Sequence, residues 1–228
     1  MTRSELARLL DHSVLKPEST DAEIRAGGAT VRAWHIGFYC VQPAWVALAA
    51  KLVAGTDALV VTVVGFPHGC DRPAIKARAA AVAVAEGAGE VDMVMPFGAL
   101  KSGDTRLVAE DITAVVRAVS GIPVKVILET GALTSDEKRV ACRLARDAGA
   151  AFVKTSTGFH PGGGATADDV RLMRAAVGSA IGVKASGGIR SLADAQAMIA
   201  AGANRIGTSA SAAILAALGA DGSQTTRA

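Results

Sequence analysis

Short apolar runs alternate with longer, alanine-rich stretches along most of the chain. The short runs are rich in β-branched residues, which is typical of buried strands, and the longer stretches have the apolar spacing of helices. The pattern predicts eight strands, over residues 14–16 with an approach from Asp11, 38–42, 59–64, 91–95, 124–129, 152–155, 182–185 and 205–208.

Helices are predicted between these strands, among them residues 71–86, 104–119, 135–147, 167–177 and 191–200. Asp136 and Glu137 suit the positive N-terminus of one helix, and Gly149 and Gly202 stand where helices should end. Strands that alternate with helices in this way predict a single-domain (β/α)8 TIM barrel over residues 1–218. A doubly wound open sheet is the alternative, and residues 219–228 are expected to form a flexible C-terminal tail.

Composition agrees with one folded domain. With 228 residues, of which 50% are hydrophobic and 20% charged, the chain is too apolar for a disordered protein. It has no run of the roughly 20 apolar residues that a membrane helix requires. The first ten residues include three charged side chains and no signal-peptide core. We therefore expect a cytoplasmic protein with no membrane partner.

Charge and cysteine content argue against two further classes of protein. The net charge is only +3, no basic run stands out, and aromatic residues make up 4% of the chain, so no nucleic-acid partner is expected. The three cysteines are widely spaced and form no CxxC motif, which argues against a disulfide framework and a zinc ribbon.

Two lysines stand inside predicted buried strands. Alternation places Lys154 on the same strand face as Phe152 and Ser156, and Lys184 recurs in the next strand, about 4.8 Å away. Lysine is seldom buried without a partner, so the pair favours function over a structural ion-pair network. A nearby like charge and partial desolvation both favour the neutral amine, which attacks carbonyl groups and forms a Schiff base.

Carboxylates near strand ends are candidates for proton transfer. Asp92 lies on the strand face opposite Val91 and Met93, which predicts that it points into the barrel, either as a proton-transfer group or as a salt-bridge partner. Asp11 is a weaker candidate because it can serve as an ordinary cap, and Glu129 can instead brace the scaffold. Cys40 ends the second strand and is a candidate for lining the pocket, although the sequence favours a small packing residue there.

Glycine-rich segments follow the last two strands. The segments Ser186-Gly187-Gly188 and Gly207-Thr208-Ser209 stand where many barrels bind phosphate through backbone N–H groups. The loop 158–164 offers further amides. Neither a Walker A nor a GxGxxG motif is present, so no nucleotide cofactor is expected. The histidines show no HxH or HExxH spacing, so no metal site is predicted, although a metal-dependent barrel lyase using His12, His68 or His160 is a rival hypothesis.

Seven segments, in this order, resemble the deoxyribose-phosphate aldolase family. They are DHSVLKP at 11–17, TVVGFP at 62–67, EVDMV at 90–94, KVILETG at 125–131, FVKTSTGF at 152–159, VKASGGIR at 183–190 and RIGTS at 205–209. The resemblance implies a metal-independent aldolase with no cofactor. It also implies reversible cleavage of 2-deoxy-D-ribose 5-phosphate to D-glyceraldehyde 3-phosphate and acetaldehyde, in deoxynucleoside catabolism.

The same resemblance implies roles for individual residues. Lys154 is the Schiff-base lysine, Lys184 perturbs its pKa, and Asp92 anchors a proton relay that Asp11 assists. Gly187, Gly188 and Ser209 hold the phosphate. Beside these implied positions, Gly158 and Gly207 are candidates for binding phosphate or substrate, and Cys40 and Thr62 are candidates for lining the pocket. Family members are often homodimers.

Three features depart from the family pattern. The segment 159–166 is one residue longer than the usual loop, Phe159 stands where some members have a lysine, and the tail lacks the tyrosine with which some members end. Two rival functions complete the expectations: an aldolase acting on a different phosphorylated sugar, and a barrel that binds a phosphorylated ligand without turnover.

Overall fold

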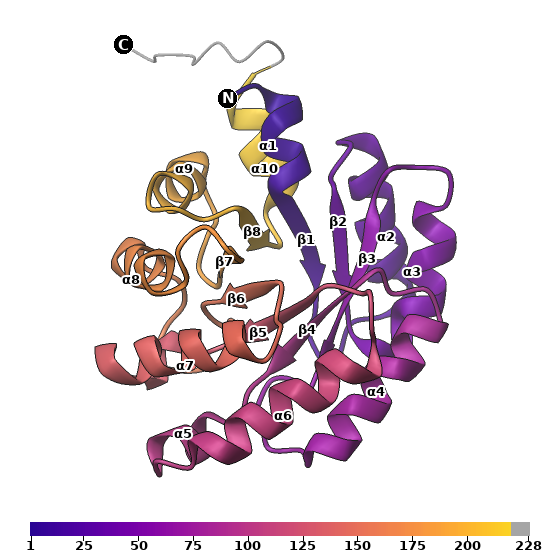
Figure 1. Cartoon of the computed structure of the whole chain (residues 1–228). Helices are drawn as coiled ribbons and strands as arrows, with labels where there is room; N and C mark the ends of the chain where they lie inside the picture. Colours follow the sequence, from indigo (N-terminus) through magenta and orange to yellow (C-terminus); the bar gives the residue numbers. More distant parts are fainter. Residues whose placement is uncertain (220–228) are drawn as a thin grey trace.

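The computed structural model describes residues 1–219, and in it eight parallel strands close into a barrel in sequence order (Figure 1). The first strand pairs with both the second and the last, so the sheet has no free edge. The strands are β1 (Leu10–Val14), β2 (Phe38–Val41), β3 (Leu59–Val64), β4 (Glu90–Val94), β5 (Val124–Ile127), β6 (Phe152–Lys154), β7 (Gly182–Ser186) and β8 (Arg205–Thr208).

Helices surround the barrel, and α1 lies beside α10 where the first and last described elements meet (Figure 1). The helices are α1 (Arg3–Leu9), α2 (Asp21–Ala33), α3 (Val46–Val53), α4 (Pro73–Ala85), α5 (Phe97–Lys101), α6 (Thr105–Ala118), α7 (Ser135–Asp147), α8 (Ala167–Val177), α9 (Leu192–Ala200) and α10 (Ser211–Ala217). Short 3-10 turns, η1 (Pro43–Trp45) and η2 (Thr130–Ala132), follow β2 and β5.

The predicted (β/α)8 barrel is confirmed, and the open-sheet alternative is wrong because β8 pairs with β1. The largest boundary error concerns the first strand, which the pattern predicts over 14–16 with an approach from Asp11 and which runs over Leu10–Val14. Pro17 limits how far this strand can extend, because proline has no N–H for the ladder and restricts the residue before it. The expected flexible tail, 219–228, lies outside the described residues except for Gly219.

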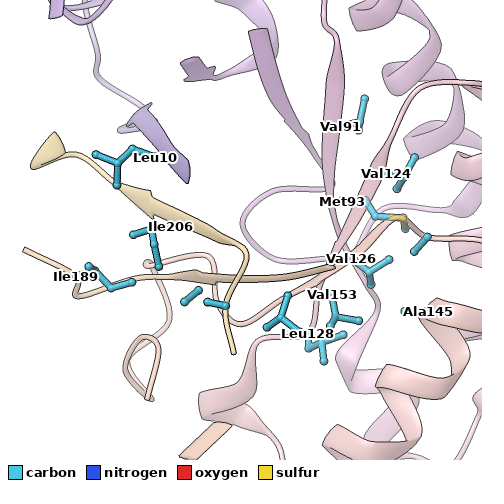
Figure 2. Close-up of a cluster of buried hydrophobic side chains, with 14 of the residues drawn as sticks. Leu10, Val91, Met93, Val124, Val126, Leu128, Ala145, Val153, Ile189 and Ile206 are labelled. Carbon is cyan, nitrogen blue, oxygen red and sulfur yellow. The ribbon is translucent and has the colours of Figure 1, made fainter. Parts of the chain in front are cut away.

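Alternation along the strands divides apolar from charged side chains. On β4, Val91 and Met93 face the helices, whereas Glu90 and Asp92 face the barrel interior, where they pair with Lys125. Figure 2 shows part of the resulting outer core, between strands and helices. Its labelled side chains are Leu10, Val91, Met93, Val124, Val126, Leu128, Ala145, Val153, Ile189 and Ile206.

Side-chain caps fix where several helices begin. Helices α2, α7 and α9 each start with a capping box, in which the hydroxyl of Thr20, Thr134 or Ser191 accepts a backbone N–H three residues on. These starts orient the loops that precede the helices, at the carboxyl ends of the strands. Within residues 1–219, no helix combines the length and apolar character needed to span a bilayer.

Candidate active site

Strands β1, β4, β6 and β7 bring the predicted chemical groups together at the centre of the barrel. Lys154 on β6 pairs in register with Lys184 on β7. The Nζ atoms of these two lysines lie 2.9 and 2.7 Å from the same oxygen, Oδ2 of Asp92 on β4. Lys184 also donates to Asp11 on β1. The structure therefore gathers all four predicted catalytic side chains into one cluster, each at most 2% exposed.

Electrostatics fix the charge of two members of this cluster. Burial alone would lower the pKa of Lys184, but the carboxylates of Asp11 and Asp92 outweigh it and raise that pKa above its usual value. Burial alone would raise the pKa of Asp92, yet the charges of Lys125, Lys154 and Lys184 lower it well below 3.8. Lys184 is thus held as an ammonium ion and Asp92 as a carboxylate.

Lys154 is the lysine with the fewest partners among the buried lysines of the described chain. An ammonium group has three N–H donors. Lys76 uses them on Asp111 and on two carbonyl oxygens, while Lys125 and Lys184 each meet two carboxylates. Lys154 makes a single hydrogen bond, to Asp92, and faces the cavity above the cluster.

Our sequence reasoning gave no role to Lys125, Glu90 or Arg205, which also lie inside the barrel. Lys125 Nζ lies 2.6 Å from Glu90 Oε2 and 2.8 Å from Asp92 Oδ1. Arg205 in turn donates to Glu90, at 3.0 Å. A signal was present, because Lys125 stands in a short apolar strand with the same alternation that pointed to Lys154 and Lys184.

A cavity of about 580 Å³ opens above the cluster, at the carboxyl ends of the strands. Its lining includes Lys154, Lys184, Asp11 and Cys40, and it includes every position predicted to bind substrate or phosphate: Gly158, Gly187, Gly188, Gly207 and Ser209. Burial raises the pKa of the Cys40 thiol to about 12, with the charge of Asp11 adding to the effect, so this thiol stays protonated at neutral pH.

Two loops touch at the edge of the cavity because glycines allow it. A Cβ on Gly164 would collide with the carbonyl oxygen of Gly187, and the N–H of Ala165 donates to that same oxygen at 3.0 Å. Glu129 braces the start of the first loop, since its carboxylate accepts from the backbone N–H of Thr157 at 3.2 Å and from its hydroxyl at 2.5 Å. Glu129 thus fits the scaffold interpretation.

Thr62, His12 and His160 make their side-chain hydrogen bonds outside the charged cluster, although His12 lines the same cavity. Alternation turns Thr62 outward, where its hydroxyl donates to the Val41 carbonyl at 3.0 Å, so the expected pocket position lies outside the cavity lining. His12 is buried and bonded to Ser211 at 3.2 Å, and His160 accepts from the N–H of Gly162 at 3.0 Å.

In residues 1–219, one group of three metal-ligand side chains lies close together: Asp11, Cys40 and Asp92. The two carboxylates in this group already accept hydrogen bonds from lysine ammonium groups, Lys184 bonding to both and Lys154 to Asp92. The Cys40 thiol is also protonated. The donor set therefore suits lysine ammonium groups better than a metal ion, which needs deprotonated and unoccupied ligands.

A closed parallel barrel with buried lysines and carboxylates beneath a cavity at its carboxyl ends defines a barrel enzyme whose chemistry centres on lysine. The sequence model described as "DeoC/LacD family aldolase" matches residues 6–217, and the chain belongs to this family of lyases.

Individual relatives agree with this assignment. The chain is 54% identical to the deoxyribose-phosphate aldolase of Macrococcus caseolyticus, over 92% of this chain and 95% of that protein. It is 55% identical to the deoxyribose-phosphate aldolase of Methanothermobacter thermautotrophicus, over 91% and 92% of the two chains. Among solved structures, the deoxyribose phosphate aldolase of Aeropyrum pernix matches with a TM-score of 0.87 and 30% identity, covering 95% of this chain and 92% of that one.

Proposed function

We propose that this aldolase reversibly cleaves 2-deoxy-D-ribose 5-phosphate to D-glyceraldehyde 3-phosphate and acetaldehyde, through a Schiff base on Lys154. The single observation that carries the proposal is the position of Lys154, which is buried, lines the cavity, and has one acceptor where Lys125 and Lys184 have two each. The names of the relatives support the choice of substrate.

The proposed reaction begins with the open-chain sugar. The neutral amine of Lys154 attacks the C1 aldehyde carbon, and loss of water leaves a protonated imine. The C2–C3 bond then breaks, its electron pair moves toward the iminium nitrogen, and the C3 hydroxyl gives up its proton to form the aldehyde of glyceraldehyde 3-phosphate. The remaining enamine is protonated at C2, and water hydrolyses the imine to release acetaldehyde and restore Lys154.

Asp92 and Lys184 are the proposed proton-transfer groups, assisted by Asp11. Lys184 as an ammonium and Asp92 as a carboxylate form a hydrogen-bonded pair at 2.7 Å, and the same carboxylate oxygen reaches Lys154 at 2.9 Å. A proton can therefore pass along this pair to and from groups bound at Lys154. Lys184 and Lys154 share this carboxylate oxygen, and that proximity supports the proposed influence of Lys184 on the Schiff-base lysine.

The proposed phosphate subsite lies at the loops after β7 and β8. Gly187 and Gly188 adopt left-handed backbone conformations, with φ of 89° and 79°, which glycine tolerates without strain. With Gly158, Gly207 and Ser209 they line the rim of the cavity, where backbone N–H groups can donate to phosphate oxygens. Phe159 offers no charge here, so backbone amides carry more of this role.

Self-association belongs to the same proposal. The Aeropyrum pernix relative is described as having a "unique tetrameric structure". A homodimer stays a prediction for this chain, and sedimentation velocity at micromolar concentration tests it.

Borohydride trapping tests the Schiff base directly. The protein is incubated with acetaldehyde, reduced, digested and mapped by mass spectrometry. We expect an ethyl adduct on Lys154, and we expect a folded Lys154→Leu variant to show neither the adduct nor turnover of 2-deoxyribose 5-phosphate. Normal turnover in that variant would contradict the proposal.

The same experiment separates the rival functions. Activity that is lost on chelation, together with no borohydride sensitivity, would favour a metal-dependent lyase. Stabilisation by 2-deoxyribose 5-phosphate without turnover would favour a binding protein. An adduct on Lys154 with turnover of a different sugar phosphate would keep the mechanism and replace the substrate.

A further inference from the structure

A chain of ion pairs runs through the barrel interior to the carboxylate that Lys154 and Lys184 share. Arg205 on β8 donates to Glu90 at 3.0 Å, and Glu90 meets Lys125 at 2.6 Å. Lys125 then meets Oδ1 of Asp92 at 2.8 Å. The guanidinium of Arg205 also lies 3.2 Å from the ring centroid of Phe38. This part of the network does not line the cavity and contacts no proposed substrate group.

Lys125 and the two cavity lysines use different oxygens of Asp92. Lys125 holds Oδ1, and Lys154 and Lys184 share Oδ2. A carboxylate with one oxygen anchored in this way cannot rotate freely about its terminal bond. The anchor is rigid, because the Lys125 side chain is fully buried and its second bond, to Glu90, is itself fixed by Arg205.

The interior also has a surplus of positive charge. Seven ionisable side chains with formal charge face it from six strands of the described chain: Asp11 on β1, Glu90 and Asp92 on β4, Lys125 on β5, Lys154 on β6, Lys184 on β7 and Arg205 on β8. Cys40 on β2 faces it as a neutral thiol, and β3 contributes Val61 and Val63. If every lysine is protonated, four cations face three carboxylates, and the charges balance when one lysine is neutral.

We propose that Lys125 is a positioning residue for the lysine chemistry of this site: it holds Oδ1 of Asp92, so that Oδ2 stays directed at Lys154 and Lys184, and its positive charge helps to keep Asp92 a carboxylate. Glu90 opposes this effect, because it is the carboxylate that pairs with both Lys125 and Arg205. The inference rests on the proposed function, since it assigns to Lys125 the control of the carboxylate beside a Schiff-base lysine.

Packing alone does not account for Lys125. A buried lysine loses its hydration, and a well-packed apolar side chain of similar volume often stabilises a protein equally or better. Methionine has nearly the length of the lysine side chain and no charge. Lys125→Met therefore removes the cation and keeps most of the volume, and Glu90→Gln does the same for the opposing carboxylate.

The test measures the pH dependence of two reactions in both variants. These are turnover of 2-deoxyribose 5-phosphate, as kcat/KM, and the rate of borohydride-trapped adduct formation with acetaldehyde. In Lys125→Met, the acidic limb of both profiles should move up by about one pH unit, because one fewer cation lets Asp92 keep its proton to higher pH. In Glu90→Gln, the limb should move down by a similar amount.

Opposite shifts in the two variants are the result that supports the proposal. A structural role would lower the activity of both variants without moving their limbs in opposite directions, and that result would overturn the proposal. Unchanged profiles in both would overturn it as well. Should Lys125→Met fail to fold by near-UV circular dichroism, Glu90→Gln alone still decides, since a limb that is unmoved or moves upward contradicts the inference.

The wild-type protein is the control that distinguishes a failure of this inference from a failure of the proposed function. If the wild-type protein gives no adduct on Lys154, the proposed function fails. The wild type can instead give the adduct and turn over the substrate while the acidic limbs of the two variants show no opposite shifts. In that case only the proposed role of Lys125 fails.

Discussion

At the scale of the residue, the number of acceptors around a buried lysine separates a structural lysine from a chemical one. Lys76 is fully buried between α4 and α6, yet its ammonium group bonds to Asp111 at 2.8 Å and to the carbonyl oxygens of Gly69 and Val94. All three N–H donors of Lys76 are therefore used in hydrogen bonds, which is typical of a structural lysine. Lys154, with one acceptor and a cavity in front of it, is the opposite case.

Lys76→Met should lower the free energy of unfolding by about 3 kcal/mol, because it leaves the Asp111 carboxylate buried without its cation. Urea denaturation at pH 7 measures this loss. The double variant Lys76→Met/Asp111→Asn is the matched control and should recover most of the stability, since neither charge remains. A single variant within about 0.5 kcal/mol of the wild type would contradict the prediction.

Individual residues also show which parts of the site can be predicted from the sequence. Period-two alternation was enough to place Lys154, Lys184 and Asp92 inside the barrel, because burial on both faces of a strand leaves charged residues conspicuous. It gave no acceptor count, so it could not rank Lys154 above Lys125. Thr62 entered through a motif alone, and its strand face excludes it from the cavity.

At the scale of the element, strands and their following loops were easier to predict than strand ends. The β5 strand ends at Ile127 rather than at residue 129. Beyond it, Glu129 has a left-handed backbone conformation, with φ of 59°, and its side chain bonds to Thr157. Those bonds are tertiary, so the local sequence carries no sign of them. Helices α1 and α3, of seven and eight residues, are short for a periodicity argument.

The contact between the loops after β6 and β7 gives a prediction at this scale. Gly164→Ala should raise the KM for 2-deoxyribose 5-phosphate about tenfold, with a smaller effect on kcat, because the new Cβ forces the loop away from the Gly187 carbonyl. Steady-state kinetics measure the two constants separately.

Gly98→Ala is the control for that variant. Gly98 lies in α5, has open space where the new methyl group would stand and needs no left-handed backbone, so both constants should remain those of the wild type. A Gly164→Ala variant with wild-type KM would show that the loop contact does not shape the phosphate subsite.

At the scale of the whole molecule, the barrel encloses a charged centre within an apolar shell. The carboxylate of Asp92 is stabilised by three lysines from β5, β6 and β7, so the closed sheet and the ion-pair network depend on each other. The outer core supplies the burial, and the inner network supplies the chemistry.

This arrangement predicts how stability responds to acid. Burial raises the pKa of Asp92, but the lysines lower it further, so the folded value lies below the 3.8 of the unfolded chain. The contribution of Asp92 is therefore complete above pH 3.8 and is lost as the pH falls below it. Urea denaturation between pH 6 and pH 2.5 should show a decline in this range that is shallower in Asp92→Asn.

Asp57→Asn is the matched control, because Asp57 is exposed and should leave the acid dependence as in the wild type. An equally steep decline in Asp92→Asn would assign the acid sensitivity to other groups.

Closure of the sheet by β8 has a consequence for how the protein is made. The pair of Asp11 and Lys184 joins residues 173 positions apart, and β1 finds its second neighbour only in β8, the last strand. During synthesis on the ribosome, the earlier strands leave the exit tunnel while β1 still has one bare edge. Until β8 emerges, the amine of Lys154 therefore stands in an open sheet. A nascent chain thus carries Lys125, Lys154 and Lys184 before β8 is available to close the barrel around them, and reactive aldehydes in the cell meet the assembled site only after that closure.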